Sequence, residues 1–296
     1  MNHHCPPPQT LRFPCCLLLG ITLSTTPLLG ERCSVTAGDT VSFAEPQEVF
    51  RSLSSLDLAK GEFETTAAYE ARKRQLVADH GLDEPLVLRG TYHPDVVRYD
   101  ADNGHFLLPK YAWNNPTGHQ RFYVFSSEPG SWSVLKKDGR LSAYGAHQVV
   151  LSAERELTRR TEAVSASGGR ATIDLYRVEV YGLFERDAAG TLSFELESWS
   201  GYDREAESPS GLMTKMVTVD ATPAEAPELK NNLVVGFQAS LKEPYAASGL
   251  GHFDATLSHR ESNTVTYSVI FADIRCVVIA GPDNKVLKVV DRAGVN

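Results

Sequence analysis

The sequence predicts an α+β fold rich in β-strand, with antiparallel strands arranged as a meander or as sandwich-like sheets. Many short runs alternate apolar and polar residues, and Gly, Pro, Asn and Asp separate them. Helical patterns are confined to two N-terminal stretches, a short stretch near 223–230 and one ambiguous segment. We expect strands at 85–92, 96–99, 105–108, 121–125, 132–135, 172–184, 191–199, 213–219, 233–237, 264–278 and 286–290.

Short turns between neighbouring strands favour hairpins over parallel β-α-β units. The clearest turn is Asp100-Ala101-Asp102-Asn103-Gly104, because Asn and Gly readily adopt positive φ. Its alternating carboxylates also resemble a calcium-binding loop, but Gly104 stands where that loop needs an oxygen ligand. We therefore interpret the segment as a hairpin turn.

The first helix is predicted to begin near Glu45 and to end near Leu56. Pro46 is tolerated in a first helical turn, and the acidic residues there suit the helix dipole. An apolar stripe at helical spacing would face the core. It consists of Val49, Phe50, Leu53 and Leu56.

A second, more polar helix is predicted between Gly61 and Gly81. Thr65 or Thr66 can cap its free N–H groups, and Gly81 is a suitable stop. We expect Tyr69 and Leu76 to dock this helix on one face of the sheet.

The same helix carries basic residues with two expected environments. Arg72 can lay its methylene stem on apolar surface and pair with a carboxylate at a sheet edge. Lys73 is expected on the solvated side.

Phe63-Glu64-Thr65-Thr66, with Tyr69 and Arg72, followed downstream by Tyr99-Asp100-Ala101-Asp102, resembles a pattern of exported bacterial proteins without an assigned activity. The resemblance covers about a third of the chain and implies no catalytic residue. From the residues themselves we expect structural roles for Phe63, Thr66, Tyr69, Arg72 and Leu76.

Residues 1–37 are predicted to be a secretion signal. Arg12 precedes the apolar run Cys15–Leu23, which is too short to span a bilayer because spanning takes about 20 apolar residues. Cleavage is expected between 24 and 37, after Ser24 or, as we favour, after Ala37.

The mature chain then divides into a helical segment and a larger β-rich region. Residues 38–82 form the helical segment. Residues 83–296 form either one antiparallel domain or two lobes that divide near 201–212.

The cysteines leave two alternatives. Cys33 and Cys276 can form a disulfide if cleavage comes early, which export would permit. Cys276 also lies in the apolar run 274–279, where a free cysteine commonly serves as a small buried hydrophobe, and we favour this interpretation.

Two segments fit the strand pattern poorly. Apolar spacing across 149–164 predicts a helix, although Thr158 and Thr161 within it favour a strand. Thr222-Pro223-Ala224-Glu225 is a capping box and predicts a short, bent helix through Lys230.

Charge and motifs exclude several classes of function. A formal net charge of −8 argues against a nucleic-acid-binding surface, which is normally basic. Gly249-Leu250-Gly251-His252 lacks the third glycine of a dinucleotide fingerprint, and we expect no cofactor.

The central part of the chain supplies two candidate sites. Imidazoles with an aspartate are the usual parts of a zinc site, and the candidates are His93, Asp95, His105 and His119. Exposed aromatic rings with neighbouring amides can form a platform of the carbohydrate-binding kind. This platform would consist of Tyr111, Trp113, Asn114 and Asn115.

The sequence therefore predicts an exported, periplasmic or extracellular protein that acts by binding a ligand or an envelope protein, without catalysis and without a transmembrane span. The alternative is a hydrolase or metal-dependent enzyme that uses the central histidines. A third possibility is a structural role in an envelope assembly through an exposed sheet edge.

Overall fold

The structure is a computed structural model, and its described residues are 33–109, 112–113, 122–128, 131–136, 148–164, 168–185, 216–256 and 259–292. Strands dominate them, and helices are few, so the predicted α+β, β-rich class is confirmed. The strand expected at 191–199 and the boundary expected near 201–212 lie outside the described residues. No helix among those described is long and apolar enough to cross a membrane.

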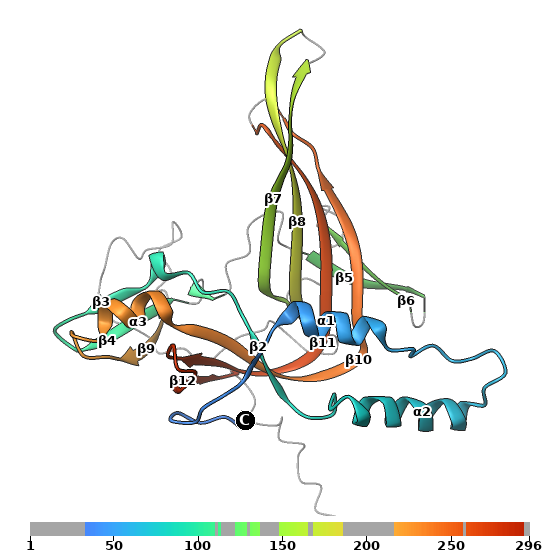
Figure 1. Cartoon of the computed structure of the whole chain (residues 1–296), viewed down its shortest axis with the longest axis horizontal. Helices are drawn as coiled ribbons and strands as arrows, with labels where there is room; N and C mark the ends of the chain where they lie inside the picture. The colour runs from blue at the N-terminus through green and yellow to red at the C-terminus, as the bar shows by residue number, and fades with distance from the viewer. Residues whose placement is uncertain are drawn as a thin grey trace, which may run out of the picture.

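Two long strands form the centre of the main sheet (Figure 1). β10 (Val234–Phe253) and β11 (Glu261–Ala280) are 20 residues each and pair antiparallel along most of their length. The sheet has the order β1-β2-β10-β11-β8-β7, and β12 pairs with β11 as well. The distal halves of β7, β8, β10 and β11 rise together beyond the body of the molecule (Figure 1).

Both edges of β11 are occupied, and one of them is shared by two strands. β10 pairs along one edge, while β8 (Arg170–Phe184) pairs with residues 261–271 on the other. β12 (Val286–Asp291) continues on that second edge and pairs with residues 276–280. A short stretch of β11, residues 272–275, therefore lies between two different partners.

An ion pair between a buried glutamate and a half-buried arginine lies at this junction. Glu185 directly follows β8, Arg292 directly follows β12, and the two side chains form an ion pair. The N–H of Ile274 donates to Glu185 Oε1 at 3.2 Å, and the N–H of Arg292 donates to the carbonyl of Arg275 at 3.2 Å. Burial raises the pKa of the Glu185 carboxyl above its usual range, and the Arg292 charge offsets this only in part.

The main sheet is mixed: most pairs are antiparallel, as expected from the short turns, but two are parallel, which the turns did not predict. β8 pairs with β11 in parallel, and β1 (Phe43–Ala44) pairs in parallel with β2 (Leu86–Arg89). Parallel neighbours require a long connection between them. β9, α3 and β10 lie between β8 and β11 in the chain, so this pairing is set by distant residues and leaves no local signal.

The segment expected as a helix at 149–164 is a strand, so that prediction is wrong. β7 (Gln148–Val164) pairs antiparallel with β8 along its length. Two bulges, between Val150 and Ser152 and between Leu157 and Arg159, interrupt the register. Each bulge inserts an extra residue, so the alternation of two is broken and resembles helical spacing.

Two smaller sheets confirm predicted hairpins. β3 (Arg98–Asp100) and β4 (His105–Pro109) pair across the predicted turn, and β9 (Met216–Asp220) extends them. Asp100 Oδ1 accepts from the N–H groups of Asp102 and Asn103, both at 3.1 Å. The Asn103 side-chain amide, which donates to Asp100 Oδ2 at 2.8 Å, lowers the pKa of Asp100 most, and these backbone bonds lower it further. Gly104 has a φ of 68°. The other predicted hairpin is β5 (Phe122–Glu128) with β6 (Ser131–Lys136).

The two N-terminal helices are present as expected. α1 (Pro46–Ser55) begins at its proline and packs the predicted stripe on the core, with Leu53 buried. α2 (Thr66–Asp79) is capped by Thr65, whose hydroxyl accepts from the N–H of Ala68 at 3.2 Å.

The third helix begins later than predicted. α3 (Ala226–Asn232) follows the predicted capping box, in which the N–H of Thr222 donates to Glu225 Oε2 at 3.0 Å and the N–H of Glu225 donates to the Thr222 hydroxyl at 3.4 Å. Pro227 therefore lies in the first turn, where its missing N–H costs nothing. A single 3-10 turn, η1, spans Pro94–Val96.

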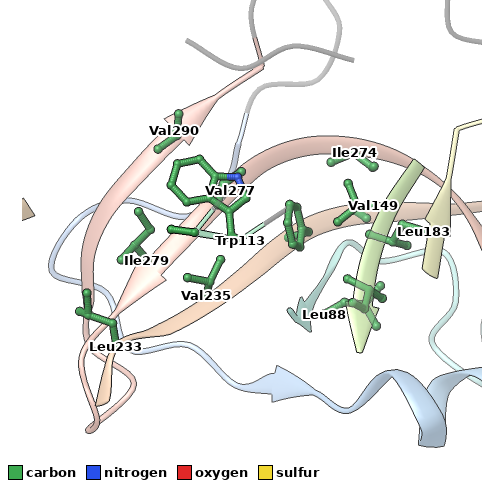
Figure 2. Packing of buried hydrophobic residues seen from close by; sticks show 14 of the residues in the cluster. Leu88, Trp113, Val149, Leu183, Leu233, Val235, Ile274, Val277, Ile279 and Val290 are labelled. Carbon is green, nitrogen blue, oxygen red and sulfur yellow. The ribbon is translucent and has the colours of Figure 1, made fainter. Parts of the chain in front are cut away.

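The largest core cluster joins the main sheet to α1, α3 and the β3-β4-β9 sheet. Trp113 is fully buried and lies among Val235, Val277 and Val290 (Figure 2). The half-buried Tyr92 joins the segment after β2 to α3, because its hydroxyl donates to the carbonyl of Lys230 at 2.7 Å. Burial raises the pKa of Tyr92 to about 12.

The N-terminal segment covers an apolar face formed by β2, β11 and β12. Cys33 is joined to Cys276 by a disulfide, so the preferred interpretation of Cys276 as a free thiol is wrong. Ser34 bonds the buried Gln238 twice, through its N–H at 2.7 Å and its hydroxyl at 2.6 Å. Val35, Val41 and Phe43 pack on the face that Val87, Cys276, Val278 and Val286 form.

Loss of the disulfide should destabilise the fold. We expect Cys33→Ser to lower the free energy of unfolding by about 2–5 kcal/mol, because the bond closes a loop over a sequence separation of 243 residues. Urea unfolding measures this change. The wild-type protein in excess reductant is the control, and it should match the variant; a variant as stable as the oxidised wild type would contradict the expectation.

Loss of Arg292 should leave Glu185 as an uncompensated buried charge. We expect Arg292→Met to lower the free energy of unfolding by about 2–4 kcal/mol at pH 8. The pKa of Glu185 is already raised, and removing Arg292 raises it further. Because the folded variant then holds a proton that the unfolded chain has lost, its stability rises as pH falls. The deficit should shrink towards pH 5.

The matched control is Arg177→Met. Arg177 pairs with Glu156 at 3.8 Å on exposed surface, so its loss should cost less than about 0.5 kcal/mol at either pH. Equal deficits for the two variants, or a deficit for Arg292→Met that does not change with pH, would contradict the assigned role of Glu185.

Candidate functional site

The histidines proposed for a metal site are not assembled into one among the described residues. His93 precedes η1 and its N–H donates to the carbonyl of Ala112 at 2.8 Å, while Asp95 lies within η1. His105 begins β4 and pairs with Asp220 across the sheet. No group of three or more His, Cys, Asp or Glu able to hold a metal occurs in the described part of the chain, and His119 lies outside it.

The proposed aromatic platform is corrected at its one described residue. Trp113 is 0% exposed and belongs to the core, so its ring cannot serve as a surface for a ligand. Tyr111, Asn114 and Asn115 lie outside the described residues. Trp113 follows a strand and stands in a polar loop sequence, which suggested exposure, but distant strands bury it.

The segment between α1 and α2, residues 56–65, projects away from the sheets (Figure 1), and we call it the arm loop. Arg72 of α2 holds its two ends together. Its guanidinium donates to the carbonyl of Asp57 at 2.6 Å and to that of Ala59 at 2.8 Å. It also forms an ion pair with Glu64 at 2.9 Å, so a single side chain fixes three points of the loop.

Further bonds complete this clamp. The Tyr69 hydroxyl donates to the carbonyl of Leu58 at 3.1 Å, and Glu64 Oε2 accepts from the N–H of Gly61 at 3.1 Å. The bond from Arg72, followed by that from Gly61, lowers the pKa of Glu64 to about 2. Glu64 therefore stays ionised through the neutral and mildly acidic range.

The clamp corrects the expected partner of Arg72 and the expected environment of Lys73. Arg72 pairs with a carboxylate just ahead of its own helix, not with a sheet edge. Lys73 is only 12% exposed at its side chain and lies 2.9 Å from both Glu70 and Glu243 of β10. It therefore connects α2 to the sheet.

Leu76 and Phe63 also differ from expectation. Val77, and not Leu76, packs against the main core cluster, and α2 buries none of its residues fully. Phe63 lies in the arm loop and is 93% exposed, so it contributes nothing to the interior. α2 contacts the rest of the fold through Val77 and through the ion pair of Lys73 with Glu243, so its docking does not depend on Leu76.

A groove of about 370 Å³ lies at the inner end of the arm loop. One wall comes from the C-terminal half of α1 and from residues 56–59, and the other from β10 at residues 244 and 246–248. Phe50, Leu53, Leu56 and Leu58 line it with apolar surface, while Ser54, Asp57 and Ser248 supply polar groups. We call this the arm groove.

A second hollow, of about 640 Å³, lies on the distal part of the main sheet. Arg160 and Asp174 line it and bond each other twice, at 2.6 and 3.1 Å. Glu261 also lines it and accepts from Arg155 at 2.6 Å. Most of its charges are already paired on exposed surface, so the arm groove is the stronger candidate.

No family model, curated protein or solved structure matches this chain. The resemblance to exported bacterial proteins therefore stays a prediction. The site must be interpreted from its own geometry.

Sequence reasoning located the helix of the clamp but missed the arm groove. The groove needs β10 beside α1, and the two are separated by nearly 190 residues in the chain (from Leu56 to Pro244). The sequence did offer one signal: Phe63 is an aromatic residue among Gly, Glu and Thr, where a structural role would need apolar neighbours.

Removal of the clamp should open the arm loop. We expect Arg72→Gln to speed tryptic cleavage after Lys60 about tenfold or more, because protease access follows local opening and the variant loses its bonds to Asp57, Ala59 and Glu64. Mass spectrometry of timed digests measures the rate. Arg74→Gln is the control, since it removes one exposed arginine from the same helix; equal rates for both variants would show that the clamp does not restrain the loop.

Proposed function

We propose that this is an exported, non-enzymatic binding protein of the periplasm or the extracellular space, and that it engages its partner through the arm loop and the arm groove. The observation that carries the proposal is the position of an exposed aromatic side chain, Phe63, in the same loop whose inner end forms part of a groove with several apolar lining residues. The described histidines offer the enzymatic alternative no assembled site.

Export is supported by the disulfide. Disulfides form and persist in oxidising compartments and are rare in reducing cytosol. Cys33 and Cys276 are joined, and the residues after Cys33 cover an apolar face of the sheet. Cleavage after Ala37 would remove this cover, so within this proposal the signal is cut ahead of Cys33, as the earlier site at Ser24 allows.

Binding is supported by the low conformational cost of using the arm loop. Ordering a flexible loop on binding costs free energy that reduces affinity. Arg72, Tyr69 and Glu64 already hold this loop in one conformation. Phe63 at 93% exposure has no role inside the described fold, and exposed aromatic anchors are typical of binding hot spots.

Export can be tested on the protein from its own host. We expect a mature N-terminus between residues 25 and 33, and we expect Cys33 and Cys276 to resist alkylation until a reductant is added. Intact-mass spectrometry before and after reduction measures both. An intact Met1 together with alkylated Cys33 and Cys276 in the cytoplasmic fraction would refute export.

Binding can be tested by photo-crosslinking in the host. Benzoylphenylalanine at position 63 should give a defined crosslinked product whose second peptide is identified by mass spectrometry. The matched control places the same probe at Leu157, an apolar residue that is 47% exposed on β7, the last strand in the order of the main sheet. Equal yields at positions 63 and 157 would contradict a binding role for the arm loop.

A further inference from the structure

We propose that the arm groove receives Phe63 from a second copy of this chain, so that two molecules form a two-fold symmetric dimer with each Phe63 in the other's groove. The inference rests on the proposed function only in using the same surface, and it names the occupant.

The first argument is adjacency. Residues 56–59 line the groove, and Phe63 follows only four residues after Ala59 in the same clamped loop. Phe63 and the arm groove are therefore neighbours along the same loop. A two-fold axis that brings one Phe63 to the partner's groove brings the second Phe63 to the first groove as well, so each contact is made twice.

The second argument is chemical fit. Phe50, Leu53, Leu56 and Leu58 give the groove apolar surface that suits an aromatic ring, while Ser54, Asp57 and Ser248 line the rest with polar groups. Among residues whose exposure is described, the large exposed hydrophobics are Phe63, Leu157, Val164 and Leu250, and Phe63 is the only aromatic one.

Charge is complementary across the same contact. Lys60 lies beside Phe63 in the arm loop and is exposed, and its ammonium group donates to Thr66 at 3.0 Å. Asp57 lines the groove. In the symmetric arrangement Lys60 of one copy faces Asp57 of the other, so the sign of the charges favours the pairing.

Interface size predicts a weak dimer. A buried aromatic side chain covers about 150–250 Å², so two of them with their groove walls stay below the roughly 1,200 Å² of a standard stable interface. We therefore expect a dissociation constant weaker than about 1 µM. Pre-organisation of the loop by Arg72 is what allows so small a contact to persist.

The test is sedimentation velocity on the oxidised mature protein from about 1 µM to about 1 mM. The wild type should pass from monomer to dimer across this range. Phe63→Ser should weaken dimerisation about tenfold or more, as loss of a central anchor does. Because Phe63 is 93% exposed, the variant should keep the wild-type unfolding midpoint, which excludes misfolding as the cause.

Two further variants make the test specific. Val164→Ser removes another exposed apolar side chain, at 64%, from β7, which contributes no residue to the groove lining, and should change the dissociation constant by less than about twofold. Ser54→Arg places a long charged side chain in the groove from an exposed position of α1 and should weaken dimerisation as Phe63→Ser does.

Mixing the two weakened variants examines the reciprocal geometry. Phe63→Ser keeps an intact arm groove and Ser54→Arg keeps Phe63, so their heterodimer retains one of the two contacts. It should form more tightly than either variant's homodimer.

A wild type that stays monomeric at all concentrations overturns the proposal, as does a dimer insensitive to Phe63→Ser or a mixture no tighter than its components. A monomer that still crosslinks from position 63 to another protein would leave the proposed binding function standing and overturn only the second copy as occupant.

Discussion

The structure depends on the fact that β11 must find hydrogen-bond partners along both edges over 20 residues of almost wholly buried chain. An unpaired backbone N–H or carbonyl in such a place costs about as much as a lost hydrogen bond. β10 satisfies one edge, while the other is divided between β8 and β12, which approach from opposite ends. Glu185 serves the backbone of Ile274 where neither strand reaches. Because the edge is divided, the N–H of Ile274 lacks a strand partner and donates to the buried Glu185 carboxylate. Arg292 then supplies the positive charge that pairs with this carboxylate.

Local chemistry explains which parts of the fold could be predicted. Thr65 as cap, Gly104 in its turn and the stripe through Leu53 each act within a few residues, and each was found in the sequence. β7 could not be assigned, because two bulges disguise its period and only pairing with β8 reveals it. The parallel pairing of β8 with β11 is likewise invisible, since the intervening chain includes strands that belong elsewhere.

The candidate site shows the same division between local and distant information. Arg72, Tyr69 and Glu64 were singled out by a sequence pattern, and they do act together, although on a loop and not on a sheet edge. Lys73 was assigned to solvent because Glu243, its partner, lies 170 positions away (243 − 73). Trp113 was assigned to a surface because its immediate neighbours are polar, while the residues that bury it come from β10, β11 and β12. Contacts between distant segments are the hardest to predict, because the local sequence around one residue contains no information about its partner.

The bond between Cys33 and Cys276 also orders events in time. A ribosome produces Cys33 long before Cys276, which comes only 20 residues before the end of a 296-residue chain. During that interval the apolar residues Val35, Val41 and Phe43 have no surface to cover, and Cys33 carries a reactive thiol. A chain that ends ahead of β11 has no Cys276, so its Cys33 cannot form this bond. The cysteine that closes the complete fold is therefore the one that an incomplete copy leaves open to other oxidants.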